Sequence, residues 1–95
     1  MVDSKNVRLH GIVSGVVQGV NFRWFTQRRA SEFDLTGYVC NLPDGSVEFV
    51  AEGTRAQLEK LLDAVRVGPS AAVVENVRTQ WAGATGEFHR FDIRF

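Results

Sequence analysis

The chain is short of several features that would assign it to a specialised class. It contains one cysteine, Cys40, and its 11 basic and 11 acidic side chains cancel. A single cysteine excludes an internal disulfide and any zinc site built from several cysteines. A net charge of zero argues against nucleic acid or a membrane surface as a partner, because both attract proteins through a net basic field.

Long apolar runs are missing as well. No stretch approaches the roughly 18 apolar residues of a membrane span, and residues 1–6 lack the apolar segment of a secretory signal. We therefore expect a protein of the reducing cytoplasm, with no membrane partner. The remaining composition is ordinary for a globular protein, with 44% hydrophobic and 23% charged residues. The length predicts a single domain over residues 1–95 with a buried core.

Alternation of apolar and polar residues predicts strands in five segments. In the first segment, Val7, Leu9 and Val13 would share one face of an extended chain. The second and third segments are separated by Pro43-Asp44-Gly45, a composition typical of a hairpin turn. The five segments are residues 7–14, 36–42, 46–52, 73–81 and 91–95.

Two further segments have the longer period of a helix. Residues 22–33 carry one apolar stripe at about 100° per residue, formed by Phe22, Phe25, Ala30 and Phe33. The second helix is expected to begin after Thr54, whose side chain would form a capping box with Gln57. It should end at Gly68-Pro69, where a glycine and then a proline stop a helix.

The order of these elements indicates the fold class. It is β-α-β-β-α-β with one more short strand at the end, which predicts an α+β protein with the ferredoxin-like split β-α-β arrangement. The sheet would be mostly antiparallel, and both helices would cover one of its faces. This fold class hosts many functions, so the fold alone names none.

A loop bracketed by glycines joins the first predicted strand to the first predicted helix. Backbone N–H groups in such a loop can converge on one anion, together with the unpaired N–H groups of the helix start. Arg23, in the first helical turn, would add a forked and permanently charged donor. The alternative is a tight turn followed by a solvent-facing arginine. The glycine spacing matches neither nucleotide-binding motif, so we expect a small phosphate-like ligand. The loop residues are Gly15, Val16, Val17, Gln18, Gly19 and Val20.

Asn41 stands near the end of a predicted strand, just before the hairpin turn. Its amide could accept a hydrogen bond from a water and donate one to an oxyanion, although asparagine is also common in turns.

His10 and His89 are single histidines in predicted strands, and both are expected to face solvent. Neither has a second ligand at metal spacing, so no metal site is expected. Cys40 lacks the Cys-x5-Arg pattern of a phosphatase nucleophile. Trp24 could lie at a substrate rim or simply on the surface.

With these residues in view, the chain closely resembles the acylphosphatase family. The family's first motif, Gly-x-Val-Gln-Gly-Val-x-Phe-Arg, is found at residues 15–23. Its second motif, Gly-aromatic-Val-x-Asn-x-x-x-Gly-x-Val, is found at residues 37–47. The similarity continues through Glu52-Gly53, Gly68-Pro69 and residues 91–95. Two departures are mild: Tyr38 stands where the family often has tryptophan, and Val16 where it often has a basic residue.

The resemblance implies a small cytoplasmic hydrolase that splits acyl phosphates into a carboxylate and inorganic phosphate, without a metal or other cofactor. In the family, the arginine that matches Arg23 binds the phosphoryl group, and the asparagine that matches Asn41 positions the attacking water. The loop that matches residues 15–20 supplies backbone donors. The implied partner is the small-molecule substrate, with no nucleic acid, and we expect a monomer.

Other interpretations stay open on the sequence alone. An RNA-recognition sheet would need a Lys/Arg-Gly-aromatic-Gly/Ala-Phe-Val-x-aromatic strand, which no segment supplies. A small-molecule regulatory domain of the same fold fits the size. So does an acylphosphatase-like domain cut from a larger maturation protein, although the zinc-binding cysteine pairs that follow such domains are not found here. A binding-only role would imply a degenerate site, yet Arg23 and Asn41 are both intact.

Overall fold

A computed structural model of the chain describes residues 5–95. The predicted lack of a secretory signal concerns residues 1–6, and residues 1–4 lie outside the described range. Within residues 5–95, no helix has the length and apolar character needed to cross a membrane. The elements are β1 (Val7–Val16), α1 (Phe22–Glu32), β2 (Thr36–Asn41), β3 (Val47–Gly53), α2 (Arg55–Val67), β4 (Val73–Gly83) and β5 (Phe91–Arg94).

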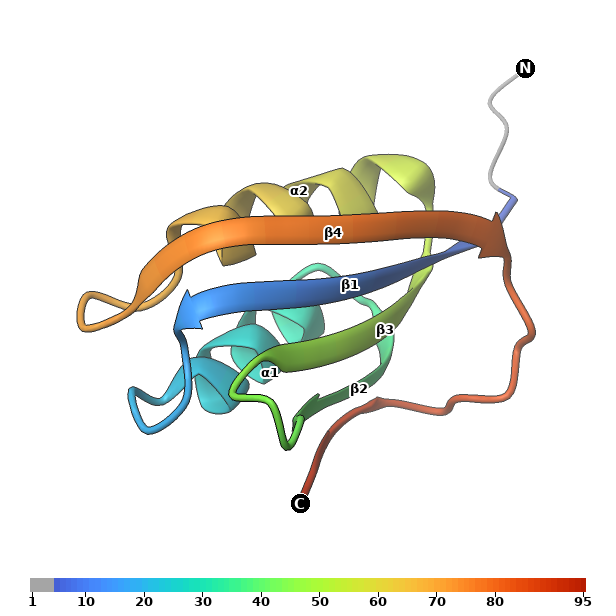
Figure 1. The fold of residues 1–95 in the computed structure, drawn as a ribbon. Helices are drawn as coiled ribbons and strands as arrows, with labels where there is room; N and C mark the ends of the chain where they lie inside the picture. The colour runs from blue at the N-terminus through green and yellow to red at the C-terminus, as the bar shows by residue number, and fades with distance from the viewer. Residues whose placement is uncertain (1–4) are drawn as a thin grey trace.

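The strands form one sheet in the order β4-β1-β3-β2-β5. Three neighbouring pairs are antiparallel, whereas β5 runs parallel to β2, with Val39 opposite Ile93. Both helices lie on the same face of this sheet, and the other face is left open (Figure 1). The predicted α+β, ferredoxin-like arrangement with a short last strand is therefore confirmed.

The core lies between the sheet and the two helices. Inward-facing residues of β1 and β3, such as Leu9 and Phe49, pack against the buried face of α2. On α1, Phe22 and Ala30 are buried as predicted, whereas Phe25 is only half-buried and Thr26 is fully buried. Thr26 is tolerated there because its hydroxyl donates to the carbonyl oxygen of Phe22 at 2.9 Å, which satisfies the buried polar group. The predicted apolar stripe of α1 was therefore only partly right. The buried residues of α2 are Leu58, Leu61, Leu62 and Val65.

The two helices begin in different ways. At α2, the Thr54 hydroxyl accepts from the Gln57 backbone N–H at 3.3 Å, and the Gln57 side chain accepts from the Thr54 N–H at 3.2 Å. This confirms the predicted capping box. At α1, the first residue is preceded by Asn21, which adopts a left-handed conformation (φ 65°, ψ 26°) and caps no N–H with its side chain. The start of α1 is thus left without the side-chain partners that α2 has.

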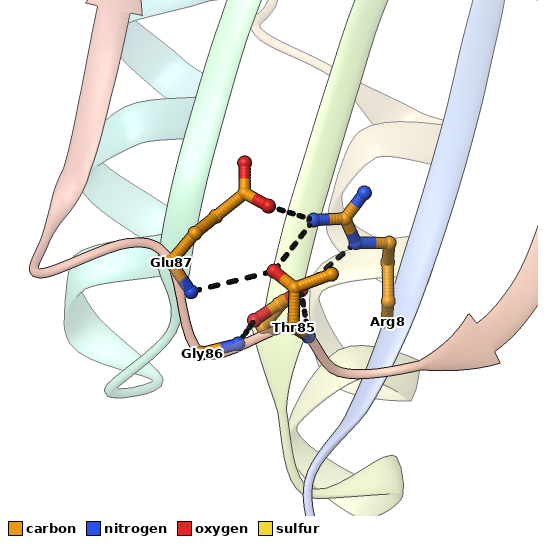
Figure 2. Close-up of polar contacts among 5 residues, drawn as sticks. Arg8, Thr85, Gly86 and Glu87 are labelled. Atoms are coloured by element: carbon orange, nitrogen blue, oxygen red, sulfur yellow. Dashed lines mark hydrogen bonds and ion pairs between the residues drawn. The ribbon is translucent and has the colours of Figure 1, made fainter.

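The connection between β4 and β5 is fastened to the sheet by a buried carboxylate. Glu52, at the end of β3, is 3% exposed and accepts hydrogen bonds from Arg8 Nε (2.8 Å), the Thr85 N–H (2.9 Å) and the Gly86 N–H (3.0 Å). Arg8 also reaches Thr85 and Glu87, so the loop residues gather around the start of β1 (Figure 2). This attachment guides the chain from β4 across to the far edge of the sheet, where β5 joins β2 (Figure 1).

Candidate active site

The glycine-bracketed loop and the β2–β3 turn lie at the same end of the sheet and are joined by one side chain. Gln18 donates from Nε2 to the carbonyl oxygens of Leu42 and Ser46, both at 2.8 Å. The Gln18 amide therefore ties the loop to the hairpin that carries Asn41. The sequence placed Gln18 in the loop, and the structure adds that its side chain holds two segments more than 20 residues apart.

Two glycines shape this loop for different reasons. Gly15 has φ 130° and sits at a bulge in the pairing of β1 with β4, where a Cβ atom would come within 2.1 Å of the Val73 carbonyl oxygen. Only glycine fits so close to the neighbouring backbone. Gly19 has φ 77°, and nothing lies within 4 Å of the place that a Cβ would occupy. Gly19 is therefore required by its backbone conformation and faces open space.

Unpaired backbone donors gather between these glycines and the start of α1. Within residues 5–95, the backbone N–H groups of Val17, Gln18, Gly19 and Val20 donate no hydrogen bond. The first N–H groups of α1 have no intrahelical acceptor, and the first turn contains no acidic side chain. Val17 is 1% exposed and Val20 packs against the core, so the loop is anchored by its apolar residues. The result is an anchored loop whose N–H groups are free to bind an anion.

Arg23 lies in the first turn of α1, and its position is set by contacts with the C-terminal residues. Its Nη1 atom is 3.5 Å from the carbonyl oxygen of Arg94, and its guanidinium carbon is 4.7 Å from the centre of the Phe95 ring. Both contacts leave the guanidinium without a carboxylate partner within residues 5–95. Its charge is therefore available to an anionic ligand.

A pocket of about 340 Å³ lies between these segments. Its polar lining consists of Gly19, Asn21, Arg23 and Asn41, and its apolar lining of Val17, Phe22, Trp24, Ile93 and Phe95. The pocket thus brings together Arg23 and Asn41. The sequence had linked these two residues only through the chemistry of their side chains. Of the predicted loop residues, Val17 and Gly19 line the pocket, whereas Gly15, Val16, Gln18 and Val20 do not.

Asn41 is the last residue of β2, and its side chain is exposed. The turn beyond it is held by Asp44, whose carboxylate accepts from the Ser46 hydroxyl (2.5 Å) and the Ser46 N–H (2.9 Å). These hydrogen bonds lower the pKa of Asp44, so the turn is braced by a charged acceptor at neutral pH. Asn41 is therefore presented at the end of a strand by a well-defined turn.

The remaining candidate residues lie elsewhere. Cys40 precedes Asn41 in β2, so its side chain points to the opposite face of the sheet. Its thiol donates a hydrogen bond to the Glu48 carboxylate at 3.6 Å. The His10 side chain is 34% exposed, and its Nε2 lies 2.9 Å from a Glu48 carboxylate oxygen, a partner that the sequence did not indicate. His89 is exposed, but in the loop before β5 and not in a strand. Within the described residues, no three His, Cys, Asp or Glu side chains gather in a way that could hold a metal ion.

Sequence reasoning did not name as site residues four of the residues that line the pocket: Asn21, Phe22, Ile93 and Phe95. Ile93 and Phe95 lie about 70 residues after Arg23 and reach the pocket only because β5 pairs with β2. Trp24, for which a place at a substrate rim was one of two alternatives, lines the pocket and is 53% exposed. No local pattern signals the parallel pairing, so nothing in the sequence pointed to these two side chains.

Comparisons with known proteins agree with this geometry. The acylphosphatase family model matches residues 9–93. The acylphosphatase of Thermobifida fusca (strain YX) is 47% identical over 90 residues, which cover 95% of this chain and 99% of that protein. Two solved structures are also similar. The acylphosphatase from Bacillus subtilis has a TM-score of 0.91 and 36% identity, with 94% of this chain and 99% of that chain covered. The acylphosphatase from Coxiella burnetii has a TM-score of 0.89 and 36% identity, with 99% and 100% covered. A match that spans nearly the whole chain on sequence, on family model and on fold means that this chain belongs to the acylphosphatase family.

Proposed function

We propose that this protein hydrolyses acyl phosphates to a carboxylate and inorganic phosphate in the pocket between the β1–α1 loop and β2. The observation that carries the proposal is that Arg23 and Asn41, one charged donor and one neutral amide, line the same pocket together with Gly19. Phosphoryl transfer depends on positioning and charge stabilisation more than on covalent chemistry. A guanidinium, an amide and a set of backbone N–H donors are therefore the kinds of group that phosphoryl transfer requires.

The phosphoryl group would bind to the loop and to Arg23. The unpaired N–H groups of residues 17–20 and the uncapped start of α1 offer hydrogen bonds and a favourable dipole to its oxygens. Arg23 would add a charge-assisted contact, which is stronger than a neutral hydrogen bond. Gly15 and Val16, which the structure places at the end of β1, and the loop residue Val20 act through the backbone and the shape of the loop, since none of them lines the pocket.

Asn41 would hold the attacking water. Its carbonyl oxygen can accept a hydrogen bond from the water while its NH₂ group donates to a phosphoryl oxygen. That arrangement places the water oxygen against phosphorus, on the side away from the acyl group. An amide is a poor base, so Asn41 orients the water and does not deprotonate it.

The chemical step then needs little help from a general acid. The water oxygen forms a bond to phosphorus as the bond between phosphorus and the acyl oxygen breaks, and the electron pair of that bond leaves with the carboxylate. The conjugate acid of a carboxylate has a pKa of about 4, so the leaving group departs as an anion. The proton of the water is accepted by the phosphate itself. One preorganised donor contributes roughly 3–4 kcal/mol in a transition state, and several reach the lower part of the enzymatic range of about 8–23 kcal/mol.

The proposed function also implies a domain organisation, an oligomeric state, a cellular location and a set of partners. We infer that residues 1–95 act as a single domain and as a monomer in the cytoplasm, on a small-molecule substrate, without metal or nucleic acid. The net charge of zero and the ion pairs that Arg8, Arg28, Arg29, Arg55 and Arg90 form with acidic side chains argue against a nucleic-acid partner. Light scattering after size exclusion would measure the mass of the particle.

Release of phosphate from benzoyl phosphate in the presence of EDTA tests the activity directly. Arg23→Ala should abolish both phosphate binding and turnover, whereas Asn41→Ala should reduce turnover by at least about 100-fold and leave phosphate binding largely intact. Calorimetry with inorganic phosphate measures the binding. Arg66→Ala and Asn76→Ala are matched controls, because both side chains are exposed and neither lines the pocket. Unchanged phosphate affinity in Arg23→Ala would contradict the role given to Arg23.

A further inference from the structure

The two halves of the pocket differ in chemistry. Its polar half, with Arg23 and Asn41, faces an apolar half formed by Trp24, Ile93 and Phe95. We propose, on the basis of the function proposed above, that Trp24, Ile93 and Phe95 bind the acyl group of the substrate. The site then selects acyl phosphates whose acyl group is apolar, uncharged and preferably a planar ring, over those that carry a second negative charge.

The exposure of these side chains is the first observation. Among residues 5–95, the exposed large apolar side chains include only two aromatic residues, Trp24 (53% exposed) and Phe95 (99% exposed). A single exposed aromatic residue is ordinary. Two that line one pocket beside a free arginine are typical of a ligand site, where the ligand removes their surface from water.

The second observation is that the aromatic rings are held in place by cations. The guanidinium of Arg28 stacks on Trp24 at 4.9 Å and lies 4.0 Å from Glu32, and the guanidinium of Arg23 lies 4.7 Å from the Phe95 ring. Such contacts orient an exposed ring without burying it. Trp24 also lines a second hollow, which it shares with Arg28 and not with the candidate site. The indole therefore separates Arg28 from the pocket.

The geometry fixes where an acyl group would lie. Arg23 contacts the Phe95 ring, and Trp24 follows Arg23 directly in α1. Because Arg23, Trp24 and Phe95 line the same pocket, a phosphoryl group bound by Arg23 would leave the part of the pocket beside Trp24 and Phe95 for the acyl group. The pocket volume of about 340 Å³ lies at the lower end of the range of about 300–1,000 Å³ for small-molecule sites. It suits a ring or a short branched chain.

The charges explain the selectivity. Among residues 5–95, Arg23 is the only cationic side chain that lines the pocket, and its guanidinium would bind the phosphoryl group. A second carboxylate on the acyl group would lie beside Trp24, Ile93 and Phe95, where it would lose part of its hydration without gaining a cation. An ion that loses water without a partner is strongly disfavoured. An uncharged ring in the same place buries apolar surface, which is favourable.

Three substrates of graded chemistry test the proposal: acetyl phosphate, benzoyl phosphate and 4-carboxybenzoyl phosphate. Each kcat/KM is divided by the spontaneous hydrolysis rate of that substrate, which removes differences in intrinsic reactivity. The wild-type protein should prefer benzoyl over acetyl phosphate by roughly 10-fold or more. It should prefer benzoyl over 4-carboxybenzoyl phosphate by a similar factor, because the two differ only in the added charge.

Variants of Trp24 then test whether this side chain causes the preference for benzoyl phosphate. Trp24→Ala should lower the benzoyl-to-acetyl ratio roughly 10-fold, Trp24→Phe should retain most of it, and Trp24→Lys should shift the preference toward the 4-carboxybenzoyl substrate. Val67→Ala is the control, since Val67 is exposed, apolar and on α2, and does not line the pocket. A benzoyl-to-acetyl ratio that is unchanged in Trp24→Ala would overturn the proposal.

Binding of stable analogues separates this inference from the proposed hydrolysis. Calorimetry compares phenacylphosphonate with acetonylphosphonate, in which carbon replaces the scissile oxygen. Tighter binding of the phenacyl compound in the wild-type protein, lost in Trp24→Ala, supports the acyl subsite even if no acyl phosphate is turned over. Equal binding of the two phosphonates would refute the subsite, and turnover of acetyl phosphate in the same protein would leave the proposed function standing.

Discussion

Arg8 Nε donates a 2.8 Å hydrogen bond to the Glu52 carboxylate, and this pair joins the start of β1 to the end of β3 where the β4–β5 loop crosses. The two residues face each other in neighbouring strands and are 44 positions apart in the sequence. A buried carboxylate is tolerated only when its oxygens are hydrogen-bonded, and here both are. The pair therefore serves as the anchor for the loop that leads to β5.

Replacing Glu52 by glutamine should destabilise the protein by about 1–3 kcal/mol, because the glutamine NH₂ group would face donors that now meet an acceptor. Urea unfolding followed by circular dichroism measures the change. Glu59→Gln is the control, since Glu59 is exposed on α2 and makes only a long contact with Arg55. A loss no larger than in the control would contradict the anchoring role of Glu52.

The same carboxylate should make stability depend on pH. Burial alone would raise the pKa of Glu52, but the hydrogen bonds from Thr85, Arg8 and Gly86 outweigh it and lower the pKa below the usual 4.5. Its contribution is thus fully present above about pH 4.5 and is lost as the pH falls through the lower, folded-state pKa. Unfolding free energies measured from pH 7 down to pH 3 should fall less steeply in Glu52→Gln than in the wild-type protein.

Two glycines with similar backbone strain should respond differently to alanine. Gly19 and Gly45 both have positive φ, 77° and 94°, and neither has an atom within 4 Å of a built Cβ. Each alanine should cost roughly 1–2 kcal/mol of stability through the backbone conformation alone. Only Gly19 lines the pocket, so only Gly19→Ala should also weaken phosphate binding. Comparable phosphate affinities in the two variants, measured by calorimetry, would speak against a role for the loop.

Removal of the Gln18 side chain should separate the loop from the hairpin. Gln18→Ala deletes two hydrogen bonds of 2.8 Å and should cost about 1–3 kcal/mol of stability. Turnover should fall further than stability explains, because the loop and Asn41 lose their common support. Steady-state kinetics well below the melting temperature measure this, with Gln80→Ala on the exposed edge of β4 as control. Full activity in Gln18→Ala would show that the loop keeps its shape without the bridge.

The Cys40 thiol should be slow to react. Burial raises its pKa, and its hydrogen bond to Glu48 raises it further, so little thiolate forms near neutral pH. Alkylation by iodoacetamide at pH 8 should be slower in the folded protein than in the urea-unfolded chain, and faster in Glu48→Gln than in the wild-type protein. Cys40→Ser should remain active, since the sulfur has no role in the proposed reaction.

The parts of this molecule that sequence could predict are those fixed by neighbours along the chain. The capping box joins Thr54 to Gln57, three residues later, and the amphipathic period of α2 spans a few turns. Both features could therefore be predicted from the sequence. The α1 stripe was harder, because Thr26 is buried through a hydrogen bond to its own helix, and a hydroxyl counts as polar in any pattern. Local propensity and hydrophobic period carry no information about such compensation.

The parts that could not be predicted rest on contacts between distant segments. The sequence paired Arg23 and Asn41 through their chemistry and the family resemblance, but their positions in one pocket depend on the fold. The contact between His10 and Glu48 was not anticipated, because the two residues are 38 positions apart in the sequence. The anchoring of Thr85 by Glu52 spans 33 residues and involves a loop with no periodic pattern. In each case the partner is brought close by the tertiary fold, which local sequence patterns do not encode.

The late position of β5 in the chain has a consequence for biosynthesis. Residues 15–41, which include the glycine loop, Arg23 and Asn41, leave the ribosome long before Ile93 and Phe95, yet all of them line or support one pocket. A nascent chain can thus contain the elements that we propose bind phosphate while one wall of the pocket is still missing. The pocket is then completed only when translation has delivered β5, and a product truncated before residue 91 would lack that wall altogether.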